Sequence, residues 1–524
     1  MTALRRNNTP WHPVAAADLE WTTDHNPSSR QFDDIYYSRD GGSEESLHVF
    51  IKGNQLTDRW QKRPQSTFCI AELGFGTGLN FLLTWQAWQA SPAPRPRLHY
   101  LAIEKHPLTK SDLERALAAW PDLAGAASTL LNHYPELIPG QHRVVLADGS
   151  LILDLWWEDV GAALPDLAQH GRKFVDAWYL DGFSPARNAT MWSHPLFAEM
   201  ARASKPGATF ATFTAAGDVR RGLSAAGFEV DKMRGFGHKR ECLRGQLKKT
   251  AIDTLPPGIP WDIPRVSSPP PTTALVIGAG IAGCTAAAAL ARRGVKVTVL
   301  EKGPVAGAAS GNEQGILYTR LSRKHSTLTD FALQSFCFAH RYYGELFSAG
   351  QLIEDIDGAL CGSFHPIGDP RKMGSIGELL HSIPEFARVV DAPQASQILG
   401  EESAEGGYWF PRSGWMRPPS TCRALLNSPC IELLEETGEV SLVSSPGSWS
   451  VSAGGKTLAQ ADCAVIATGA DVAAIEELKW LPVQSIRGQT TTLPADEPMR
   501  KLQAAVCHTG YVSPARRGRL CIGA

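Results

Sequence analysis

The chain has 524 residues, 43% of them hydrophobic and 20% charged, with a formal net charge of −2. This length exceeds a single domain core, so we expect two or three domains, and the near-neutral charge leaves any contact with nucleic acid to a local basic patch. The first residues lack an apolar signal region, no run reaches the ~18 apolar residues of a membrane span, and the ten cysteines form no C-x-x-C pair, so we expect a cytoplasmic protein with no membrane contact and no metal site.

The first half of the chain alternates short apolar runs with helical patterns. The apolar runs span residues 67–73, 98–104, 143–149, 176–182 and 208–214. Such alternation is typical of a mostly parallel sheet with crossover helices. Residues 228–247 follow as a predicted antiparallel hairpin around a glycine-containing turn. We therefore predict an α/β, Rossmann-like domain over residues 1–250.

A glycine-rich turn, AELGFGTGLN, follows the first of these runs and has the form E-x-G-x-G-x-G. Glu104 ends the next strand, where a carboxylate can accept hydrogen bonds from both ribose hydroxyls, and Asp148 ends RVVLADG, where it can accept from an adenine amino group. Any one of these acids can instead cap a helix. A ligand with adenosine but no pyrophosphate is implied, and the pattern resembles class I S-adenosyl-L-methionine-dependent methyltransferases. The predicted cofactor residues are Glu72, Gly74, Gly76, Gly78, Glu104 and Asp148.

A proline-rich segment separates the two halves of the chain. Residues 254–273 contain seven prolines and no hydrophobic periodicity, as expected of a stiff linker. We therefore predict a linker at residues 251–273 and a second domain at residues 274–524.

The second domain opens with a strand, turn, helix and strand in TALVIGAGIAGCTAAAALARRGVKVTVLEKG. Gly278, Gly280 and Gly283 give G-x-G-x-x-G, and Glu301 ends the second strand. In this arrangement the glycines let backbone and helix approach a pyrophosphate, and the acidic residue accepts from a ribose hydroxyl. These four residues are therefore predicted to bind a dinucleotide.

Later motifs favour FAD over NAD. They are VAGAASGNEQGILY at 305–318, DCAVIATGA at 462–470 and R-G-Q at Arg487, Gly488 and Gln489. In this order they resemble the D-amino acid oxidase-like family of FAD enzymes, which implies an FAD-dependent oxidoreductase domain. Because the chain ends at RLCIGA, we expect this domain to be incomplete, with Leu520 and Ile522 in an unsupported terminal strand and with weak FAD binding.

The prediction of two different cofactors in one chain limits the functions that the chain can have. ELGFGTGLNF, DAWYLDGFSPARN, ATFTAAGDVRRGLSAAGF and GFGHKRE occur in that order. They resemble the first half of the bifunctional tRNA 5-methylaminomethyl-2-thiouridine biosynthesis proteins, although Ala189-Thr190 replaces the proline and acid more usual there. The resemblance implies that the flavin half removes the carboxymethyl group from 5-carboxymethylaminomethyl-(2-thio)uridine at the tRNA wobble position. The other half then N-methylates the exposed amine.

Two other interpretations stay open. The motifs alone would also fit an oxidase of glycine-like or sarcosine-like amines fused to a small-molecule amine methyltransferase. A non-enzymatic RNA-binding relic is the second alternative, although intact glycine turns argue against drift.

Methylation needs an unprotonated amine, so a carboxylate at the site is useful as a base. Asp181, at the carboxyl end of the strand in YLDGFSP, is the predicted base, and it can instead cap the next helix or contact the cofactor. Phe183 and Pro185 would shape a dry slot beside it. By the family resemblance, NPSSRQFDDIYYS lines the substrate mouth. The predicted substrate residues are Phe32, Asp33, Asp34 and Tyr36.

Contact with tRNA requires local positive charge, and one basic cluster offers it. Its members are Arg220, Arg221, Lys232, Arg234, Lys239, Arg240, Lys248 and Lys249, with Phe228 and Phe236 between them. Neutralisation of phosphates by such a patch would make affinity fall steeply with salt. A solvated surface is the alternative interpretation.

Overall fold

The structure, a computed structural model, describes residues 9–22, 26–38, 41–64, 66–168, 173–248 and 270–523. Its internal contacts divide it into two units, Met1–Arg265 with Ser322–Phe338, and Val266–Leu321 with Ala339–Ala524. The segment Ser322–Phe338 thus belongs with the first unit, although the sequence division assigns it to the second domain. In the predicted linker, residues 251–269 lie outside the described residues.

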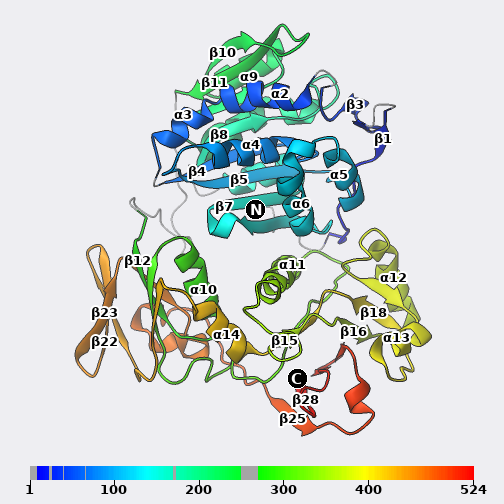
Figure 1. Ribbon diagram of the computed structural model, residues 1–524, viewed down its shortest axis with the longest axis vertical. Helices are drawn as coiled ribbons and strands as arrows, with labels where there is room; N and C mark the ends of the chain where they lie inside the picture. The colour runs from blue at the N-terminus through cyan, green and yellow to red at the C-terminus, as the bar shows by residue number, and fades with distance from the viewer. Residues whose placement is uncertain are drawn as a thin grey trace. The chain divides into compact units, whose positions relative to one another are not determined.

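The first unit is built on one eight-stranded sheet (Figure 1). In spatial order its strands are β10 (Phe228–Arg234), β11 (Glu241–Leu247), β9 (Ser204–Thr212), β8 (Val175–Leu180), β4 (Thr67–Leu73), β5 (Arg97–Glu104), β7 (Leu151–Trp157) and β6 (Gly140–Leu146). The strands β9, β8, β4, β5 and β7 are parallel, whereas β11 and β6 run antiparallel to their neighbours. The predicted Rossmann-like sheet and the β10–β11 hairpin are confirmed.

Helices cover both faces of this sheet because its strands bury apolar side chains alternately on two sides. On β4, Phe68 and Ile70 join one core cluster, while Cys69, Ala71 and Leu73 join the other. The first cluster is covered by η1 (Leu47–Lys52), α3 (Leu56–Gln61), α4 (Leu79–Ala90), α5 (Lys110–Leu117), η2 (Pro121–Leu123) and α6 (Ala124–His133), and α2 (Gly42–Ser46) lies against η1 and α4. The second is covered by α7 (Val160–Leu167), η5 (Ala189–Trp192), α8 (His194–Ala203) and α9 (Gly217–Ala225).

One strand of the sheet was not predicted. LILDLWW forms β7, which lies between β5 and β6. The run RVVLADG was expected to be a parallel strand, but β6 ends at Leu146 and turns back through η3 (Ala147–Gly149) into β7. Because β6 is antiparallel, the residues after it lie at the edge of the sheet where β5 begins.

The N-terminal segment adds a small three-stranded sheet of β1 (Leu19–Trp21), β2 (Pro27–Ser29) and β3 (Asp34–Ile35). Before it, residues next to Trp11 pair with segment 322–338. The Trp11 amide donates to the Arg323 carbonyl at 2.9 Å, and the His325 amide donates to the Thr9 carbonyl at 2.9 Å. The start of the chain is thereby tied to a segment that is distant in sequence.

The second unit contains a four-stranded parallel sheet with the order β20 (Ile431–Leu434), β13 (Lys296–Leu300), β12 (Thr273–Ile277) and β24 (Cys463–Ile466). Helices α10 (Ile281–Arg292) and α14 (Pro418–Leu426) pack together beside it, and an antiparallel sheet of β21 (Ser441–Ser445), β22 (Ser448–Ala453) and β23 (Lys456–Ala461) covers the core that includes Leu275 and Leu300. The strand, turn, helix and strand expected at the start of this half are present.

The rest of the second unit is a seven-stranded sheet with short helices and a smaller sheet. The order of the larger sheet is β17 (Arg388–Val390), β18 (Gly407–Phe410), β16 (Ser363–Pro366), β26 (Ala505–Cys507), β27 (Tyr511–Val512), β28 (Arg519–Gly523) and β25 (Thr490–Pro494). The smaller sheet is β14 (Gly315–Leu317), β19 (Gly414–Met416) and β15 (Gly358–Ala359), and the remaining helices are α12 (Pro370–Leu380), α13 (Ala392–Leu399), η6 (Gly469–Ala474), η7 (Glu476–Leu478) and η8 (Met499–Lys501). Helix α11 (Thr327–Ser348) begins in the segment assigned to the first unit and ends in the second.

The last strand corrects an expectation. Leu520 and Ile522 were predicted to lie in an unsupported strand, but β28 pairs with β25 on one side and with β27 on the other. Leu520 is buried. The unpaired terminal strand, one of the reasons for expecting weak FAD binding, is therefore absent.

Candidate functional site

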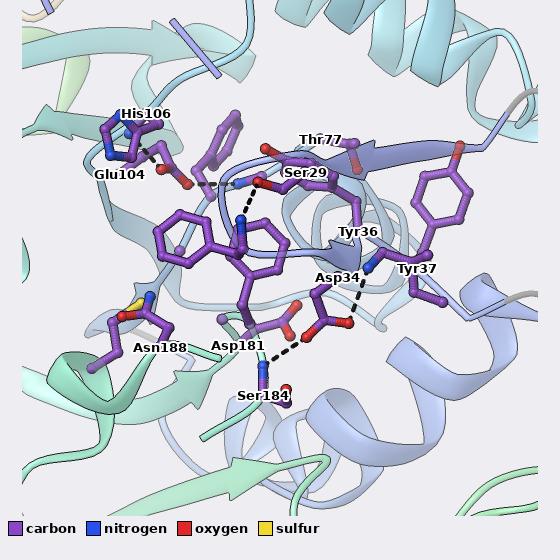
Figure 2. A pocket seen from close by; sticks show the side chains of 18 of the residues that line it. Ser29, Asp34, Tyr36, Tyr37, Thr77, Glu104, His106, Asp181, Ser184 and Asn188 are labelled. Carbon is purple, nitrogen blue, oxygen red and sulfur yellow. Dashed lines mark hydrogen bonds between the residues drawn. The ribbon is translucent and has the colours of Figure 1, made fainter. Parts of the chain in front are cut away.

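A cavity of about 460 Å³ opens in the first unit, at the carboxyl ends of β4, β5, β7 and β8 (Figure 2). Open α/β sheets bind ligands at this edge. Of the predicted site residues, the cavity is lined by Phe32, Asp34, Tyr36, Gly74, Gly76, Glu104 and Asp181. Segments that are distant in sequence therefore meet around one space.

The glycine turn after β4 needs its glycines for conformation and for space. Gly74 has φ 96°, and a Cβ there would lie 2.2 Å from the Asp181 carbonyl oxygen. Gly76 has φ 51°, and its amide donates to Glu104 Oε2 at 3.1 Å. Gly78, with φ 71°, caps α4. The turn thus brings backbone against the strand ends that carry Glu104 and Asp181.

Glu72 lies beneath the cavity rather than in its wall. Its side chain is fully buried, with Oε1 accepting from Asn80 Nδ2 at 2.8 Å and Oε2 accepting from the Tyr100 hydroxyl at 2.8 Å. Burial and the nearby Asp181 raise the pKa of Glu72 well above its usual range, against these two hydrogen bonds. Glu72 therefore supports neighbouring side chains and does not line the space that a ligand would fill.

Asp181 follows β8 and faces the cavity. Asn80 Nδ2, which already donates to Glu72, also donates to Asp181 Oδ2 at 2.6 Å. Desolvation raises the pKa of Asp181 to about 7, and Glu45 adds to this, while Asn80 and Lys239 oppose it. A carboxylate with that pKa can take up a proton near neutral pH.

Glu104 ends β5 and is held by backbone amides. Its Oε2 accepts from Gly76 and its Oε1 accepts from the His106 amide at 2.8 Å. Burial raises the pKa of Glu104, although the surrounding backbone donors oppose the rise. The carboxylate is thus fixed in orientation beside the glycine turn.

Asp148 does not lie in this cavity, which corrects the sequence prediction. It is exposed, in the turn between β6 and β7, where Leu151 pairs with Leu98 at the start of β5. Glu104, by contrast, pairs with Trp157 at the other end of β5. The antiparallel course of β6 therefore puts Asp148 at the opposite edge of the sheet.

The acids that follow β7 take the place expected for Asp148. Glu158 and Asp159 both line the cavity. Asp159 Oδ1 accepts from the Gly161 amide at 2.8 Å at the start of α7, and Asp159 Oδ2 lies 3.1 Å from Lys105 Nζ. The apolar run LILDLWW followed by two acids is the sequence signal that could have identified them.

The N-terminal segment forms an aromatic wall. Phe32 stacks on Phe183 with ring centroids 4.7 Å apart, and Tyr36 meets the edge of Phe183 at 5.2 Å. Pro185, expected beside Phe183, is not among the residues that line the cavity. An aromatic slot next to Asp181 therefore involves a segment more than a hundred residues earlier in the chain.

The adjacent acids of this segment point to different places. Asp34 lines the cavity, and its Oδ2 accepts from the Ser184 amide at 2.9 Å. Asp33 was predicted to line the same mouth, but it lies outside the cavity lining and pairs with Arg187 at 2.9 Å on the surface. Asp33 is therefore corrected to a surface position.

The lining of the cavity is acidic. Its acidic members are Asp18, Asp34, Glu45, Glu104, Glu158, Asp159 and Asp181, and its lysines are Lys105 and Lys239. Lys239 Nζ lies 2.7 Å from Glu45 Oε1, and Lys105 is paired with Asp159. Buried polar atoms with no partner among the described residues also occur on lining residues, namely Tyr37 Oη, Asn80 Oδ1 and His106 Nε2. Such a cavity fits a cationic ligand that brings hydrogen-bonding groups of its own.

In the second unit, the turn after β12 has the geometry of a dinucleotide turn. A Cβ on Gly278, at φ 103°, would lie 2.5 Å from the Ala467 carbonyl oxygen, and one on Gly283 would lie 1.9 Å from the Gly278 carbonyl oxygen. The Ala279 amide donates to Glu301 Oε2 at 2.7 Å. These contacts bring α10 close to β12 and place the Glu301 carboxylate beside the turn.

The other flavin motifs lie partly around this turn. Ser310 Oγ accepts from the Ile281 amide at the start of α10 at 3.0 Å, and a Cβ on Gly280 would lie 3.1 Å from that oxygen. Thr468, next to Ala467, has a buried Oγ1 with no partner among the described residues. Arg487, Gly488 and Gln489 are exposed ahead of β25. An open helix start, a flanking carboxylate and an unpartnered hydroxyl fit the phosphate and ribose of FAD.

The basic cluster presents less unpaired positive charge at the surface than its sequence suggests. Arg221, Lys232, Lys239 and Lys248 form ion pairs with Asp218, Glu241, Glu45 and Glu229, respectively. Phe228 is buried against Phe210, which excludes it from base stacking. Arg220, Arg234 and Arg240 are exposed and have no ion pair within the described ranges, and Lys249 lies outside them. Three arginines therefore remain as phosphate-binding candidates.

No group of three or more His, Cys, Asp or Glu side chains with the arrangement of a metal site occurs in the part of the chain that the structure describes. No helix there is long and apolar enough to cross a membrane.

Comparisons with known proteins match both halves of the chain. A family described as S-adenosyl-L-methionine-dependent methyltransferase matches residues 121–248, and a family described as FAD dependent oxidoreductase matches residues 273–524. The tRNA 5-methylaminomethyl-2-thiouridine biosynthesis bifunctional protein MnmC of Stutzerimonas stutzeri is 42% identical over 511 residues, which is 97% of this chain and 76% of that protein. The protein of the same name from Chromobacterium violaceum is 43% identical over 520 residues, with the same two coverages.

Proposed function

The chain belongs to the family of bifunctional tRNA 5-methylaminomethyl-2-thiouridine biosynthesis proteins, and from this premise we propose residue roles for its two activities. It is an enzyme that modifies a tRNA wobble uridine with FAD and S-adenosyl-L-methionine as cofactors. The flavin half removes the carboxymethyl group of 5-carboxymethylaminomethyl-(2-thio)uridine, and the methyltransferase half N-methylates the resulting aminomethyl group. The acidic cavity at the carboxyl edge of the first sheet carries the proposal for the second step.

We assign methyl transfer to residues 1–250 and amine oxidation to residues 274–524, with residues 251–273 as linker. The two family matches, at 121–248 and 273–524, support this division. We also propose that the protein works in the cytoplasm, because tRNA is its substrate.

S-adenosyl-L-methionine supplies an electron-poor methyl group on a sulfonium cation, and the acidic cavity suits that charge. Glu104 would accept from the ribose hydroxyls, and Gly74 and Gly76 would let the backbone approach the ligand. Asp159 or Glu158, after β7, would accept from the adenine amino group in place of Asp148. Glu72 would act indirectly, by holding Asn80.

Asp181 is the proposed base. An aminomethyl group is largely protonated at neutral pH and cannot attack until it loses a proton. Asp181, with a pKa of about 7, can accept that proton. Methyl transfer then forms the nitrogen–carbon bond as the carbon–sulfur bond breaks. Phe32, Phe183 and Tyr36 would hold the modified uracil and exclude water from the slot.

FAD supplies a two-electron acceptor for the amine. Glu301 would accept from the ribose of its adenosine half, and the first turn of α10, opened by Gly278, Gly280 and Gly283, would face the pyrophosphate. Thr468 Oγ1, buried and unpartnered among the described residues, would donate to the cofactor.

Binding of tRNA is the step for which we propose the exposed arginines Arg220, Arg234 and Arg240. Each would meet a phosphate and release counterions. Lys232 and Lys248 of the same cluster pair with acidic residues, whereas these arginines have no ion pair within the described residues, and this difference supports the choice.

The decisive experiment is mass spectrometry of wobble nucleosides after incubation of the purified chain with hypomodified tRNA and each cofactor separately. We expect FAD alone to convert the carboxymethylaminomethyl nucleoside to the aminomethyl form, and S-adenosyl-L-methionine alone to convert the aminomethyl form to the methylaminomethyl form. Turnover of free glycine or sarcosine without any change in tRNA would instead support the small-molecule alternative. Binding of tRNA without conversion of either nucleoside would support the non-enzymatic one.

A further inference from the structure

We propose that Asp34 is a specificity residue of the methyl-transfer cavity, where its carboxylate, together with Asp181, admits the primary ammonium and repels the precursor that still carries a carboxylate. This inference rests on the proposed function, because the two forms of the uridine are the substrate and the product of the flavin half. It concerns which of them the methyltransferase half accepts.

The position of Asp34 is fixed by the backbone around it. Its Oδ2 accepts from the Ser184 amide at 2.9 Å and its Oδ1 accepts from the Ile35 amide at 3.0 Å. Ser184 lies three residues after Asp181, and both acids line the cavity (Figure 2). The loop that carries the proposed base therefore also holds the second carboxylate in place.

Among the residues that the structure describes, the lining of the cavity offers no unpaired lysine or arginine to compensate a second negative group. Its two lysines are already paired with acids of the same lining, Lys239 with Glu45 and Lys105 with Asp159. The two hydrogen bonds to the Asp34 carboxylate come from the Ile35 and Ser184 amides, which are uncharged. A substrate carboxylate brought to this place would face like charges at short range in a partly desolvated space, which is strongly unfavourable.

The chemistry makes such a selection necessary. The carboxymethylated precursor is a secondary amine. Once this amine is deprotonated, its nitrogen lone pair can attack a methyl donor just as the lone pair of a primary amine can. If it did so, a nitrogen–carbon bond would form as the carbon–sulfur bond of the donor breaks, and the donor would leave as a neutral thioether. The proton of the methylated nitrogen would then pass to Asp181, and a tertiary amine would result. Discrimination therefore requires a feature of the site that repels the carboxylate, which is the negative element that specificity often needs.

The test compares Asp34→Asn with Asp33→Asn in the full-length protein. Asn keeps an oxygen that can accept from the Ser184 amide, so the loop retains its hydrogen bond while the charge is lost. Asp33→Asn removes the same charge from the neighbouring residue, which lies outside the cavity lining and pairs with Arg187. Each protein is incubated with S-adenosyl-L-methionine and an excess of tRNA bearing either form. Oxygen and other electron acceptors are excluded so that the flavin half cannot turn over.

The measured quantity is the ratio of methylation rates for the carboxymethylaminomethyl and aminomethyl forms, from mass spectrometry of the nucleosides. Wild-type protein should methylate the aminomethyl form and leave the precursor almost untouched. Asp34→Asn should raise the ratio by about tenfold or more, the effect of removing one unfavourable charge pair, and Asp33→Asn should leave it unchanged. A new nucleoside, with a methyl group in place of the amine hydrogen of the precursor and therefore heavier by CH2, would identify the gained activity.

Three results would overturn the proposal. They are a wild-type protein that methylates both forms at similar rates, an Asp34→Asn protein that binds the donor in calorimetry yet keeps the wild-type ratio, and equal changes in both variants. If Asp34→Asn fails to bind the donor, Asp34→Ser serves as the second charge-removing variant, with the same expected ratio. A wild-type protein that leaves the aminomethyl form unmethylated would contradict the proposed function itself, so the two failures are distinguishable.

Discussion

Replacing Asp181 by Asn removes the proposed base while keeping the size of the side chain. The Asn80 amide that donates to Asp181 Oδ2 at 2.6 Å would still find an oxygen acceptor, so the link from Glu72 through Asn80 can persist. The variant therefore separates proton removal from the shape of the cavity. Loss of a general base typically slows a reaction by about 10²-fold or more, which corresponds to ~2.7 kcal/mol in the activation barrier.

The pKa of Asp181 sets the form of the pH dependence. Since burial raises this pKa to about 7, the fraction of ionised base rises from about one tenth at pH 6 to about nine tenths at pH 8. The wild-type rate of methyl transfer should accordingly increase about tenfold over this interval and fall as the pH drops below the pKa of the base. The Asp181→Asn rate should lack this limb.

Single-turnover methylation of tRNA bearing the aminomethyl nucleoside, followed by nucleoside mass spectrometry from pH 6 to pH 8, measures both effects. Calorimetry with S-adenosyl-L-methionine provides the control, because Asp181→Asn should bind the donor with nearly wild-type affinity. A variant that turns over at the wild-type rate would exclude Asp181 as the base. A variant that keeps the wild-type pH limb would show that another group, or the substrate amine itself, produces it.

Three further predictions concern the support of the two sites and the tRNA surface. Glu72→Gln should change the free energy of unfolding in a denaturant titration by less than about 1 kcal/mol, because burial raises the pKa of this carboxyl and so favours its neutral form. Glu72→Ala should cost about 2 kcal/mol, because the buried Tyr100 hydroxyl would lose its acceptor and the Asn80 amide would keep only Asp181 of its two acceptors. Gly283→Ala should purify with little bound flavin by absorbance, since its Cβ would lie 1.9 Å from a backbone carbonyl oxygen, while Gly303→Ala, with nothing within 4 Å, should retain it. Arg234→Ala combined with Arg240→Ala should weaken tRNA binding and lower the slope of log affinity against log salt by about 1 to 2 in filter binding, and an unchanged slope would remove these residues from the interface.

The local sequence was sufficient to predict the two glycine turns. Gly74 and Gly278 adopt φ values of 96° and 103°, and a Cβ would lie 2.2 Å and 2.5 Å, respectively, from the carbonyl oxygen of a residue that follows a neighbouring strand. Such positions tolerate only glycine, so the requirement is written in the sequence as a fixed spacing. The strands before these turns are short apolar runs, and they too were predicted from residues alone.

The local sequence does not determine in the same way which strands pair with each other. RVVLADG has the composition of a buried parallel strand, yet β6 is antiparallel to β7, and Asp148 consequently lies at the edge of the sheet away from the cavity. Which partner a strand chooses depends on the whole sheet, and one reversal moves its final residue by the length of a strand. The same reasoning applies to Leu520, because the pairing of β28 with β25 and β27 involves residues that carry no motif.

Side-chain direction is a further property that composition does not contain. Lys239 counts as part of a basic cluster in the sequence, but its ammonium group lies 2.7 Å from Glu45 and lines the acidic cavity. Phe228 and Phe236 are equivalent by composition, yet Phe228 is buried in the core. A cluster of basic residues in the sequence therefore predicts a binding surface only where those residues are not paired with acidic residues nearby in space.

The adjacent acids Asp33 and Asp34 show how far this limit reaches. Both follow Phe32 in a segment predicted to line the substrate mouth, and nothing in their composition distinguishes them. Asp33 has a φ of 48° and pairs with Arg187 on the surface, whereas Asp34 begins β3 and accepts from an amide 150 positions later in the chain. Because that distant amide belongs to the loop of the proposed base, Asp34 rather than Asp33 lies where its charge would act on the substrate. Neutralising one acid and then the other changes the same charge in the same dipeptide, so any difference in substrate preference must come from the fold rather than from the composition.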